Sequence, residues 1–208
     1  MKIKNVIFDL GAVMFDWNPK AISERFTSNV DLQNRIQSQL YYHQDWKDFD
    51  CALITEIEAT KRASKRLDIS LIQTQELFKQ TKESLTLISK TRDVLCEVKD
   101  KNLKAYCLSN ISPELFNYVH ERHDLFEMFD GVVTSGEEKT GKPNKRIFEI
   151  LIERHQLKVE ECLFIDDSKE NTATANILGI SSVTFKGLDS CYKDIYTYLS
   201  SNNTHPLS

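Results

Sequence analysis

Five short apolar runs rich in β-branched residues recur along the chain, and stretches with a helical pattern separate them. The runs cover residues 6–8, 103–108, 132–134, 162–165 and 183–185. Strands that alternate with helices form βαβ units, in which helices bury a parallel sheet on both faces. Residues 144–155 predict one such helix, because Ile147, Ile150 and Leu151 fall on one face. We therefore predict an α/β fold with a Rossmann-like parallel sheet as its core.

The segment between the first two predicted strands is too long for a single crossover. Residues 16–86 contain no convincing strand and have the pattern of several amphipathic helices. Over residues 53–67, for example, helical spacing places five apolar or small residues on one face: Leu53, Ile57, Thr60, Ser64 and Leu67. We predict an all-helical cap, residues 16–86, inserted into a core formed by residues 1–15 and 87–208. A single continuous α/β domain with long helical crossovers is the alternative.

Composition excludes several classes of protein. The 208 residues carry a net charge of -4 and no Lys/Arg-rich run, so we expect no nucleic-acid partner. No apolar stretch approaches the roughly 18 residues of a membrane helix, so we expect no membrane association. The five cysteines are scattered and form no C-x-x-C pair, which favours neither disulfides nor a zinc cluster. With no small-residue cleavage site near the start, we expect a cytoplasmic protein with reduced thiols.

Polar residues stand where three of the predicted strands end. Asp9 follows the first run, Ser109 follows the second, and Asp166 and Asp167 follow the fourth. In open α/β sheets, ligands bind outside the carboxyl ends of the strands. We therefore expect these side chains to converge on one crevice, although they are far apart in the sequence.

The three aspartates suggest phosphoryl-transfer chemistry. A carboxylate such as Asp9 can attack a phosphoryl group and form an aspartyl-phosphate, although an Asp in this place can also simply cap a turn. Asp166 and Asp167 are adjacent like charges, which a cation would stabilise. Hard oxygen ligands beside a phosphate suit Mg²⁺. The alternative for this pair is an acidic N-cap of a helix that begins near Glu170.

Lys142 lies in the segment Thr140-Gly141-Lys142-Pro143 just before a predicted helix. Pro143 disfavours a helical Lys142, so the lysine belongs to a constrained loop. A fixed ammonium there can offset charge that develops on a phosphoryl group. Lys139 is the competing candidate, although a solvated loop lysine is its simpler interpretation. Ser109 and Asn110 could donate to phosphate oxygens, or they could mark a turn before the next helix.

Four segments, taken in order, resemble the motifs of the haloacid-dehalogenase-like hydrolase superfamily. They are residues 6–13, 108–110, 135–148 and 164–171. The likeness is to the small-molecule phosphatases of the superfamily that carry a helical cap after the first strand. It extends over nearly the whole chain outside residues 16–86.

The resemblance implies a role for each matching residue. Asp9 would be the nucleophile and a ligand of Mg²⁺, and the backbone carbonyl of Gly11 a second ligand. Asp167 would bind the metal, with Asp166 beside it in direct or indirect contact. The phosphate oxygens would be held by Ser109 and Asn110, and Lys142 would neutralise the phosphoryl group and Asp9.

One position departs from the superfamily pattern. Most of its phosphatases have a second Asp two residues after the nucleophile, as general acid and base, where this chain has Gly11. Asp16 is the nearest carboxylate that follows, but a helix N-cap ahead of Pro19 is its simpler role. The resemblance includes bacterial sugar-1-phosphate phosphatases, and an anomeric oxygen leaves more readily than an ordinary alcohol. We therefore expect a Mg²⁺-dependent phosphohydrolase that acts on a small phosphate monoester, such as a sugar 1-phosphate, through an aspartyl-phosphate on Asp9.

Two other functions stay open. The 2-haloacid dehalogenases of the superfamily also lack the second Asp, but they need no Mg²⁺, and the Asp166-Asp167 pair argues mildly against them. A phosphate-binding or regulatory protein without turnover is the non-enzymatic alternative. The aromatic residues of segment 16–86, such as Trp17, Tyr41 and Trp46, suit sugar stacking but more often form a core. The expected partner is a small phosphorylated metabolite, and the sequence fixes neither its identity nor the oligomeric state.

Overall fold

The computed structural model describes residues 2–200, and its core is a five-stranded parallel sheet in the order β3-β2-β1-β4-β5. The strands are β1 (Asn5–Phe8), β2 (Lys104–Ser109), β3 (Gly131–Thr134), β4 (Cys162–Asp166) and β5 (Ser181–Thr184). Each strand overlaps one of the five apolar runs. The prediction of an α/β fold with a parallel sheet core is therefore confirmed.

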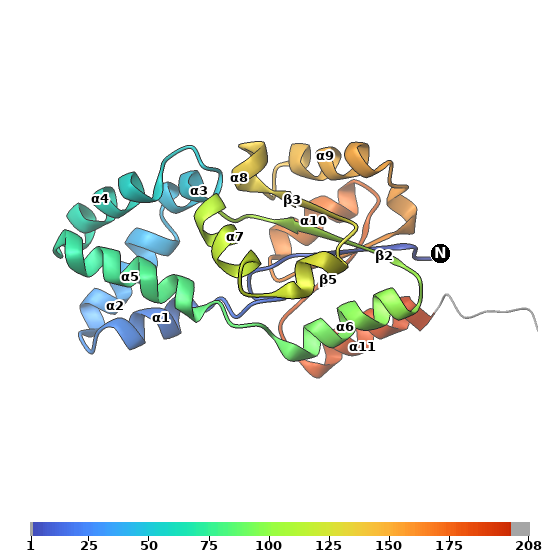
Figure 1. Ribbon diagram of the computed structural model, residues 1–208, viewed down its shortest axis with the longest axis horizontal. Coiled ribbons are helices and arrows are strands. Elements are labelled where there is room, and N and C mark those ends of the chain that lie inside the picture. The colour runs from blue at the N-terminus through green and yellow to red at the C-terminus, as the bar shows by residue number, and fades with distance from the viewer. Residues whose placement is uncertain (1, 201–208) are drawn as a thin grey trace, which may run out of the picture.

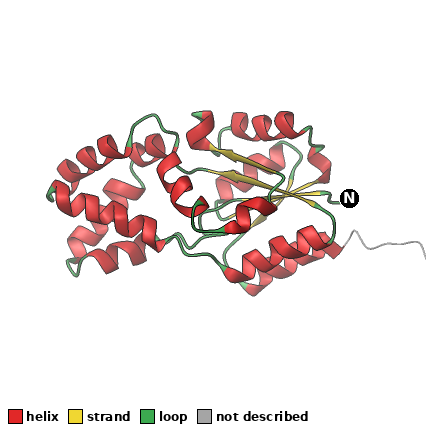
Figure 2. Ribbon diagram, viewed as in Figure 1, coloured by secondary structure: helices red, strands yellow, loops and turns green. Residues whose placement is uncertain are grey.

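Helices cover both faces of the sheet (Figure 2). In β1, Val6 and Phe8 pack on the face that α6 and α11 cover, whereas Ile7 packs on the face of α9 and α10. Burial on both sides explains why the strand is apolar at every position rather than at alternate ones. The helices of this part are α6 (Ser89–Asp100), α7 (Pro113–His120), α8 (Ser135–Glu138), α9 (Lys145–His155), α10 (Lys169–Ile177) and α11 (Asp189–Ser200), with short 3₁₀ turns η2 (Asp124–Met128) and η3 (Val159–Glu161).

The central strand β1 marks the point where the strand order reverses. The next strand along the chain, β2, pairs with one side of β1, and β4 pairs with the other side. A crevice forms at the carboxyl ends of the strands at such a switch point. Asp9 directly follows β1 and Asp166 ends β4, so the topology brings these two carboxylates to the same crevice.

Every secondary-structure element within residues 16–86 is a helix, and the segment forms a lobe beside the sheet (Figure 1). Its start and end lie side by side, because the N–H of Asp16 donates to the carbonyl of Thr86 and that of Ile88 to the carbonyl of Met14, both at 2.8 Å. The division into domains at residues 16 and 86 stays a prediction. The helices are α1 (Pro19–Phe26), α2 (Val30–Ile36), the π-helical turn η1 (Gln37–Tyr41), α3 (Gln44–Asp50), α4 (Glu56–Leu67) and α5 (Leu71–Ser84).

The buried face of α4 differs from the predicted one. The helix begins only at Glu56, after Thr55 accepts a hydrogen bond from the N–H of Glu58, and Leu53 lies outside it. Leu53 and Ile57 are 60% and 68% exposed, so the predicted face was wrong at these two positions, whereas Thr60 and Leu67 on that face are buried. Besides Leu67, the buried residues of α4 are small: Ala59, Thr60 and Ala63. Their short side chains let α4 lie close to its neighbours, a preference that a search for large apolar residues misses.

Candidate active site

Asp9 lies buried at the carboxyl end of β1, at the bottom of a pocket. Its N–H continues the sheet ladder by donating to the carbonyl of Ile165 at 3.0 Å. The chain then turns sharply, since the N–H groups of Met14 and Phe15 both donate to the carbonyl of Leu10 at 2.8 Å. In this turn the N–H of Leu10 donates to Oδ1 of Asp9 at 2.7 Å. The local backbone therefore fixes the orientation of the carboxylate.

Lys142 reaches into the same site from the loop between α8 and α9. Its Nζ lies 2.8 Å from Oδ1 of Asp9 and 2.6 Å from Oδ2 of Asp166, and it donates to the carbonyl of Leu108 at 2.7 Å. An ammonium has three protons, and these three acceptors match them. The side chain is 1% exposed. Burial lowers the pKa of Lys142, but the charges of Asp9 and Asp166 outweigh burial and raise it to about 12, so the lysine stays charged.

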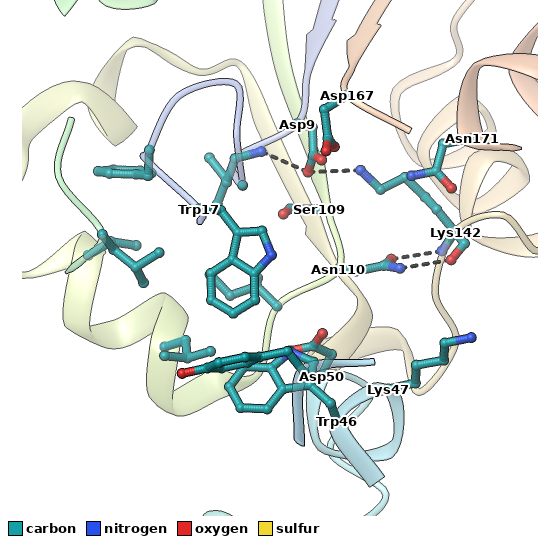
Figure 3. Close-up of a pocket in the computed structure, with 18 residues that line it drawn as sticks. Asp9, Trp17, Trp46, Lys47, Asp50, Ser109, Asn110, Lys142, Asp167 and Asn171 are labelled. Carbon is teal, nitrogen blue, oxygen red and sulfur yellow. Dashed lines mark hydrogen bonds and ion pairs between the residues drawn. The ribbon is translucent and has the colours of Figure 1, made fainter. Parts of the chain in front are cut away.

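Asn110 holds the backbone of Lys142 in place. Its Nδ2 donates to the carbonyl of Lys142 at 2.8 Å, and the N–H of Lys142 donates to its Oδ1 at 2.7 Å (Figure 3). The predicted role of Asn110 was to donate to phosphate, and only the second hydrogen of its Nδ2 is left for that. Ser109 is buried at the end of β2, and its hydroxyl faces the pocket between Asp9 and Asn110.

Asp166 is fully buried and its two oxygens are occupied by protein groups. Besides Lys142, Oδ1 accepts from the N–H of Ser168 at 2.8 Å, and Nδ2 of Asn171 lies 3.0 and 3.1 Å from the two oxygens. The contacts of Asp166 therefore favour orienting Lys142 over direct metal binding. Asn171 lines the pocket and was part of the fourth sequence motif, but it was not among the predicted site residues.

The carboxylates of Asp9, Asp166 and Asp167 form a group that could hold a small cation. One oxygen from each lies within 4.8 Å of the others. Asp167 is half-buried, and burial followed by the charge of Asp166 raises its pKa. An oxygen-only donor set with clustered negative charge suits a hard divalent ion such as Mg²⁺. Gly11 lines the pocket beside Asp9, as the predicted carbonyl ligand requires.

The pKa of Asp9 reflects the competition between burial and its neighbours. Burial raises it, Lys142 lowers it, and Asp166 and Asp167 raise it further, with a net result of about 7. Three carboxylates around one ammonium leave an excess of negative charge. The site is therefore electrostatically prepared for a cation.

The pocket above Asp9 has a volume of about 250 Å³ and walls from both parts of the chain. Trp17 and Trp46 stand close together in it, with ring centroids 5.6 Å apart, and both belong to the predicted cap segment. The apolar and aromatic lining consists of Leu10, Phe15, Trp17, Tyr41, Trp46, Leu85, Ile111, Leu115 and Val119. The aromatic residues of the segment thus serve both as its core and as the pocket wall.

Asp50 also lines the pocket, and nothing in the sequence indicated it. It ends α3 and lies on the opposite side of the pocket from Asp9 (Figure 3). Burial, followed by the negative charge of Asp9, raises its pKa well above the ordinary range. Nothing in the local sequence separates Asp50 from Asp45 or Asp48 on the same helix, because the difference lies in how the helix docks.

Two other residues weighed from the sequence lie outside the pocket lining. Asp16 is exposed and does not cap α1, since the N-cap is Asn18, whose side chain accepts from the N–H of Ala21. That correction follows from spacing: Asn18 directly precedes Pro19, the first residue of the helix. Lys139 is exposed, and its Nζ donates to the carbonyl of Ala52 at 3.1 Å, so it links the two parts of the chain.

The comparison with known families agrees with this geometry. A model described as a hydrolase family, haloacid dehalogenase-like hydrolase, matches residues 3–179. The chain belongs to this haloacid dehalogenase-like (HAD) hydrolase family.

Two curated fungal relatives resemble the HAD hydrolase over most of its length. A sesquiterpene phosphatase of Aspergillus oryzae is 27% identical over 85% of the chain and 87% of the relative. A drimenol cyclase of Aspergillus calidoustus is 26% identical over 98% of the chain. The chain spans only 40% of the length of that cyclase.

Solved structures give the same fold. A HAD family enzyme from Bacteroides thetaiotaomicron is 26% identical, with a TM-score of 0.75 over 93% of this chain and 99% of that one. The same enzyme in complex with magnesium and inorganic phosphate has a TM-score of 0.73 at 26% identity, over 90% and 96% of the two chains. The L-2-haloacid dehalogenase from Xanthobacter autotrophicus has a TM-score of 0.67 over 99% and 85%, but at 18% identity it shares the fold alone.

None of the helices in residues 2–200 combines the length and the apolar character that a membrane crossing requires. The cytoplasmic location and the lack of a nucleic-acid partner stay predictions.

Proposed function

We propose that this HAD hydrolase is a Mg²⁺-dependent phosphohydrolase that cleaves a small phosphate monoester through an aspartyl-phosphate on Asp9. The observation that carries the proposal is the contact of Lys142 with Asp9. Asp9 is also part of the cluster with Asp166 and Asp167 that could bind a metal. The enzyme from Bacteroides thetaiotaomicron that resembles this chain binds magnesium and inorganic phosphate, and the relative from Aspergillus oryzae is a phosphatase. Both support phosphate as the group that enters the pocket.

In this proposal Asp9 attacks phosphorus with its Oδ2. The N–H of Leu10 and the ammonium of Lys142 occupy Oδ1, and within residues 2–200 no donor occupies Oδ2. The attack forms a bond between Oδ2 and phosphorus while the bond from phosphorus to the leaving oxygen breaks. Water then hydrolyses the aspartyl-phosphate and regenerates Asp9.

The surrounding groups hold the phosphoryl oxygens and the metal. Ser109 and the free N–H of Asn110 donate to these oxygens, and Lys142 offsets their charge. Asp9, Asp167 and the carbonyl of Gly11 would hold Mg²⁺, with Asp166 as either a further ligand or the partner that orients Lys142. A bound Mg²⁺ would supply positive charge to the phosphoryl oxygens and offset the repulsion among the aspartates.

The residues of the pocket wall indicate which kind of alcohol the substrate contains. A sugar 1-phosphate, the prediction from sequence, would need partners for its hydroxyl groups. Among the described residues, the wall is mostly apolar, and the hydroxyl of Tyr41 is already hydrogen bonded to Thr81 at 2.6 Å. This lining and the sesquiterpene phosphatase relative favour a second candidate, the monophosphate of an apolar alcohol. Values of kcat/KM for glucose 1-phosphate, glucose 6-phosphate and farnesyl phosphate would rank the candidates.

The experiment that tests the function is a hydrolysis assay on these phosphates and on 2-chloropropionate, each with Mg²⁺ and with EDTA. We expect phosphate release that requires Mg²⁺ and disappears in Asp9→Asn, because an amide cannot attack phosphorus. Metal-independent release of halide would assign the dehalogenase function instead. Phosphate binding without any turnover would assign the regulatory alternative.

A further inference from the structure

The proposed reaction needs a proton donor for the leaving oxygen, and Gly11 cannot supply one. Three aspartates line the pocket within the described residues: Asp9, Asp50 and Asp167. Asp9 serves as the nucleophile, and Asp167 belongs to the group that could bind the metal. Asp50 is the one without a role.

Asp50 lies where the proton is needed. In phosphoryl transfer the attacking and leaving oxygens are roughly in line, on opposite sides of phosphorus. A donor to the leaving oxygen must therefore lie across the pocket from the nucleophile. Figure 3 shows Asp50 across the pocket from Asp9, with the hydroxyl of Ser109 at an intermediate height in the view.

Contacts with the sheet core fix Asp50 relative to the nucleophile. The backbone carbonyl of Asp50 accepts a hydrogen bond from Oγ of Ser135 at 2.6 Å. The same Oγ accepts from the N–H of Ile111 at 2.9 Å, two residues beyond Ser109. Lys139 adds its hydrogen bond to the carbonyl of Ala52. These contacts connect the end of α3 to the loops that carry the predicted phosphate-binding residues.

The surroundings of Asp50 favour its protonated form. Burial is the main cause of its raised pKa, and the charge of Asp9 is the second. Hydrogen bonds from the backbone of Ser112 and the side chain of Trp46 oppose these effects without cancelling them. As the last residue of α3, Asp50 also lies at the negative end of a helix, where a carboxylate is disfavoured.

The charged residues that line the pocket together with Asp50 are Asp9, Asp167, Lys47 and Lys142. Lys142 is committed to Asp9, Asp166 and the carbonyl of Leu108. Asp48 and Lys139 lie near the adjacent Cys51. Lys47 and Lys139 are exposed, and Lys139 is already committed to the carbonyl of Ala52. Solvent screens both lysines, so the buried negative charge of Asp9 dominates.

We propose that Asp50 is the general acid and base of the reaction, in the place of the Asp that this chain lacks at position 11. The proposal rests on the phosphatase function proposed above. As Asp9 attacks and the bond to the leaving oxygen breaks, the carboxyl of Asp50 gives its proton to that oxygen and the alcohol departs. The Asp50 carboxylate then takes a proton from the water that attacks the aspartyl-phosphate, which releases phosphate and restores both aspartates.

This assignment changes the expected range of substrates. With an acid in the pocket, the leaving group need not be a weakly basic one such as the anomeric oxygen of a sugar 1-phosphate. Ordinary alkyl phosphates become substrates as well. The helical lobe would then contribute a catalytic residue, so that removal of the lobe removes the acid.

The test compares two substrates with similar aromatic rings, 4-nitrophenyl phosphate and 4-nitrobenzyl phosphate. The phenolate leaves without a proton, whereas the benzylic alkoxide needs one. The proteins are the wild type, Asp50→Asn and the control Asp48→Asn, which changes a carboxylate of the same helix that does not line the pocket. In Asp50→Asn we expect kcat/KM, which covers the steps up to the departure of the leaving group, to fall about 10²–10⁴-fold for the benzyl ester and by less than about threefold for the phenyl ester. Loss of the base in the second step lowers kcat for both esters. Asp48→Asn should match the wild type on both.

Equal losses of kcat/KM on both substrates in a folded Asp50→Asn protein, or no loss of kcat/KM on the benzyl ester, would overturn the proposal. A second measurement needs no variant: the wild-type ratio of kcat/KM for the benzyl ester to kcat/KM for the phenyl ester should fall as rising pH ionises the acid, and a constant ratio would contradict the proposal. A wild type that hydrolyses neither ester with Mg²⁺ would overturn the phosphatase function itself. If instead the wild type hydrolyses both esters and Asp50→Asn does so equally well, only the role of Asp50 is overturned.

Discussion

Gly141 lies so close to the side chain of Asn110 that a Cβ atom at position 141 would come within 2.8 Å of its Oδ1. The same Oδ1 accepts the hydrogen bond from the N–H of Lys142. The absence of a side chain at Gly141 thus lets Asn110 hold the backbone of the lysine that contacts Asp9. Glycine is required at position 141 because the side chain of Asn110 approaches it closely, and not because of an unusual backbone conformation.

Gly141→Ala should therefore lower kcat by about 10–100-fold, because a small displacement of Lys142 misaligns its ammonium. The double-mutant cycle with Asn110→Ala checks the cause. If Asn110 transmits the effect, Gly141→Ala should cost much less in the Asn110→Ala background. Fully additive losses would show that Gly141 acts by another route.

Lys142→Met should reduce kcat by about 10²–10³-fold, the usual effect of removing one preorganised charge contact. The matched control is Lys139→Met, which removes an exposed lysine three residues earlier. We expect the control to lose far less activity, because Lys139 contacts the carbonyl of Ala52 and not the reacting groups. A larger loss in Lys139→Met would mean that the third motif is misplaced.

Asp167→Asn should weaken Mg²⁺ binding strongly while raising the melting temperature of the metal-free protein. Both effects follow from the removal of one charge from the group formed by Asp9, Asp166 and Asp167. Calorimetric titration with Mg²⁺ and thermal unfolding in EDTA measure them, with Glu170→Gln, an exposed nearby acid, as the control. Unchanged Mg²⁺ affinity in Asp167→Asn would contradict the assignment.

The stability of the metal-free protein should depend on the ionisation of Asp9. Its pKa is about 7 in the fold against an ordinary value of 3.8, so the fold favours the protonated carboxyl. That contribution is complete below pH 3.8 and is lost as the pH rises to about 7. In EDTA, the melting temperature of the wild type should therefore fall relative to that of Asp9→Asn over this range. Parallel curves for the two proteins would show that Asp9 ionises normally.

The sheet and most of its site could be predicted from sequence because their signals are local. Each strand is a short apolar run, and the run in β1 ends at Asp9 as that in β4 ends at Asp166. Parallel strands place such ends at the same edge of the sheet. The order β3-β2-β1-β4-β5 then makes Asp9 and Asp166 neighbours, and Lys142 joins them from the loop before α9.

Asp50 and the buried face of α4 could not be predicted because they depend on how the helical lobe packs. The carboxylates of Asp45, Asp48 and Asp50 share one short helix, and of these three only Asp50, whose backbone carbonyl accepts from Oγ of Ser135, lines the pocket. In α4, close packing selects the small Ala59 and leaves Ile57 exposed. Both outcomes are set by contacts between segments rather than by sequence periodicity.

The account depends on a covalent intermediate at Asp9, and trapping that intermediate tests it most directly. Borohydride added during turnover with Mg²⁺ reduces an aspartyl-phosphate to homoserine, which peptide mass spectrometry can locate. We predict homoserine at position 9 in the wild type, dependent on both substrate and Mg²⁺. Rapid turnover with an unmodified Asp9, or homoserine at another aspartate, would contradict the account.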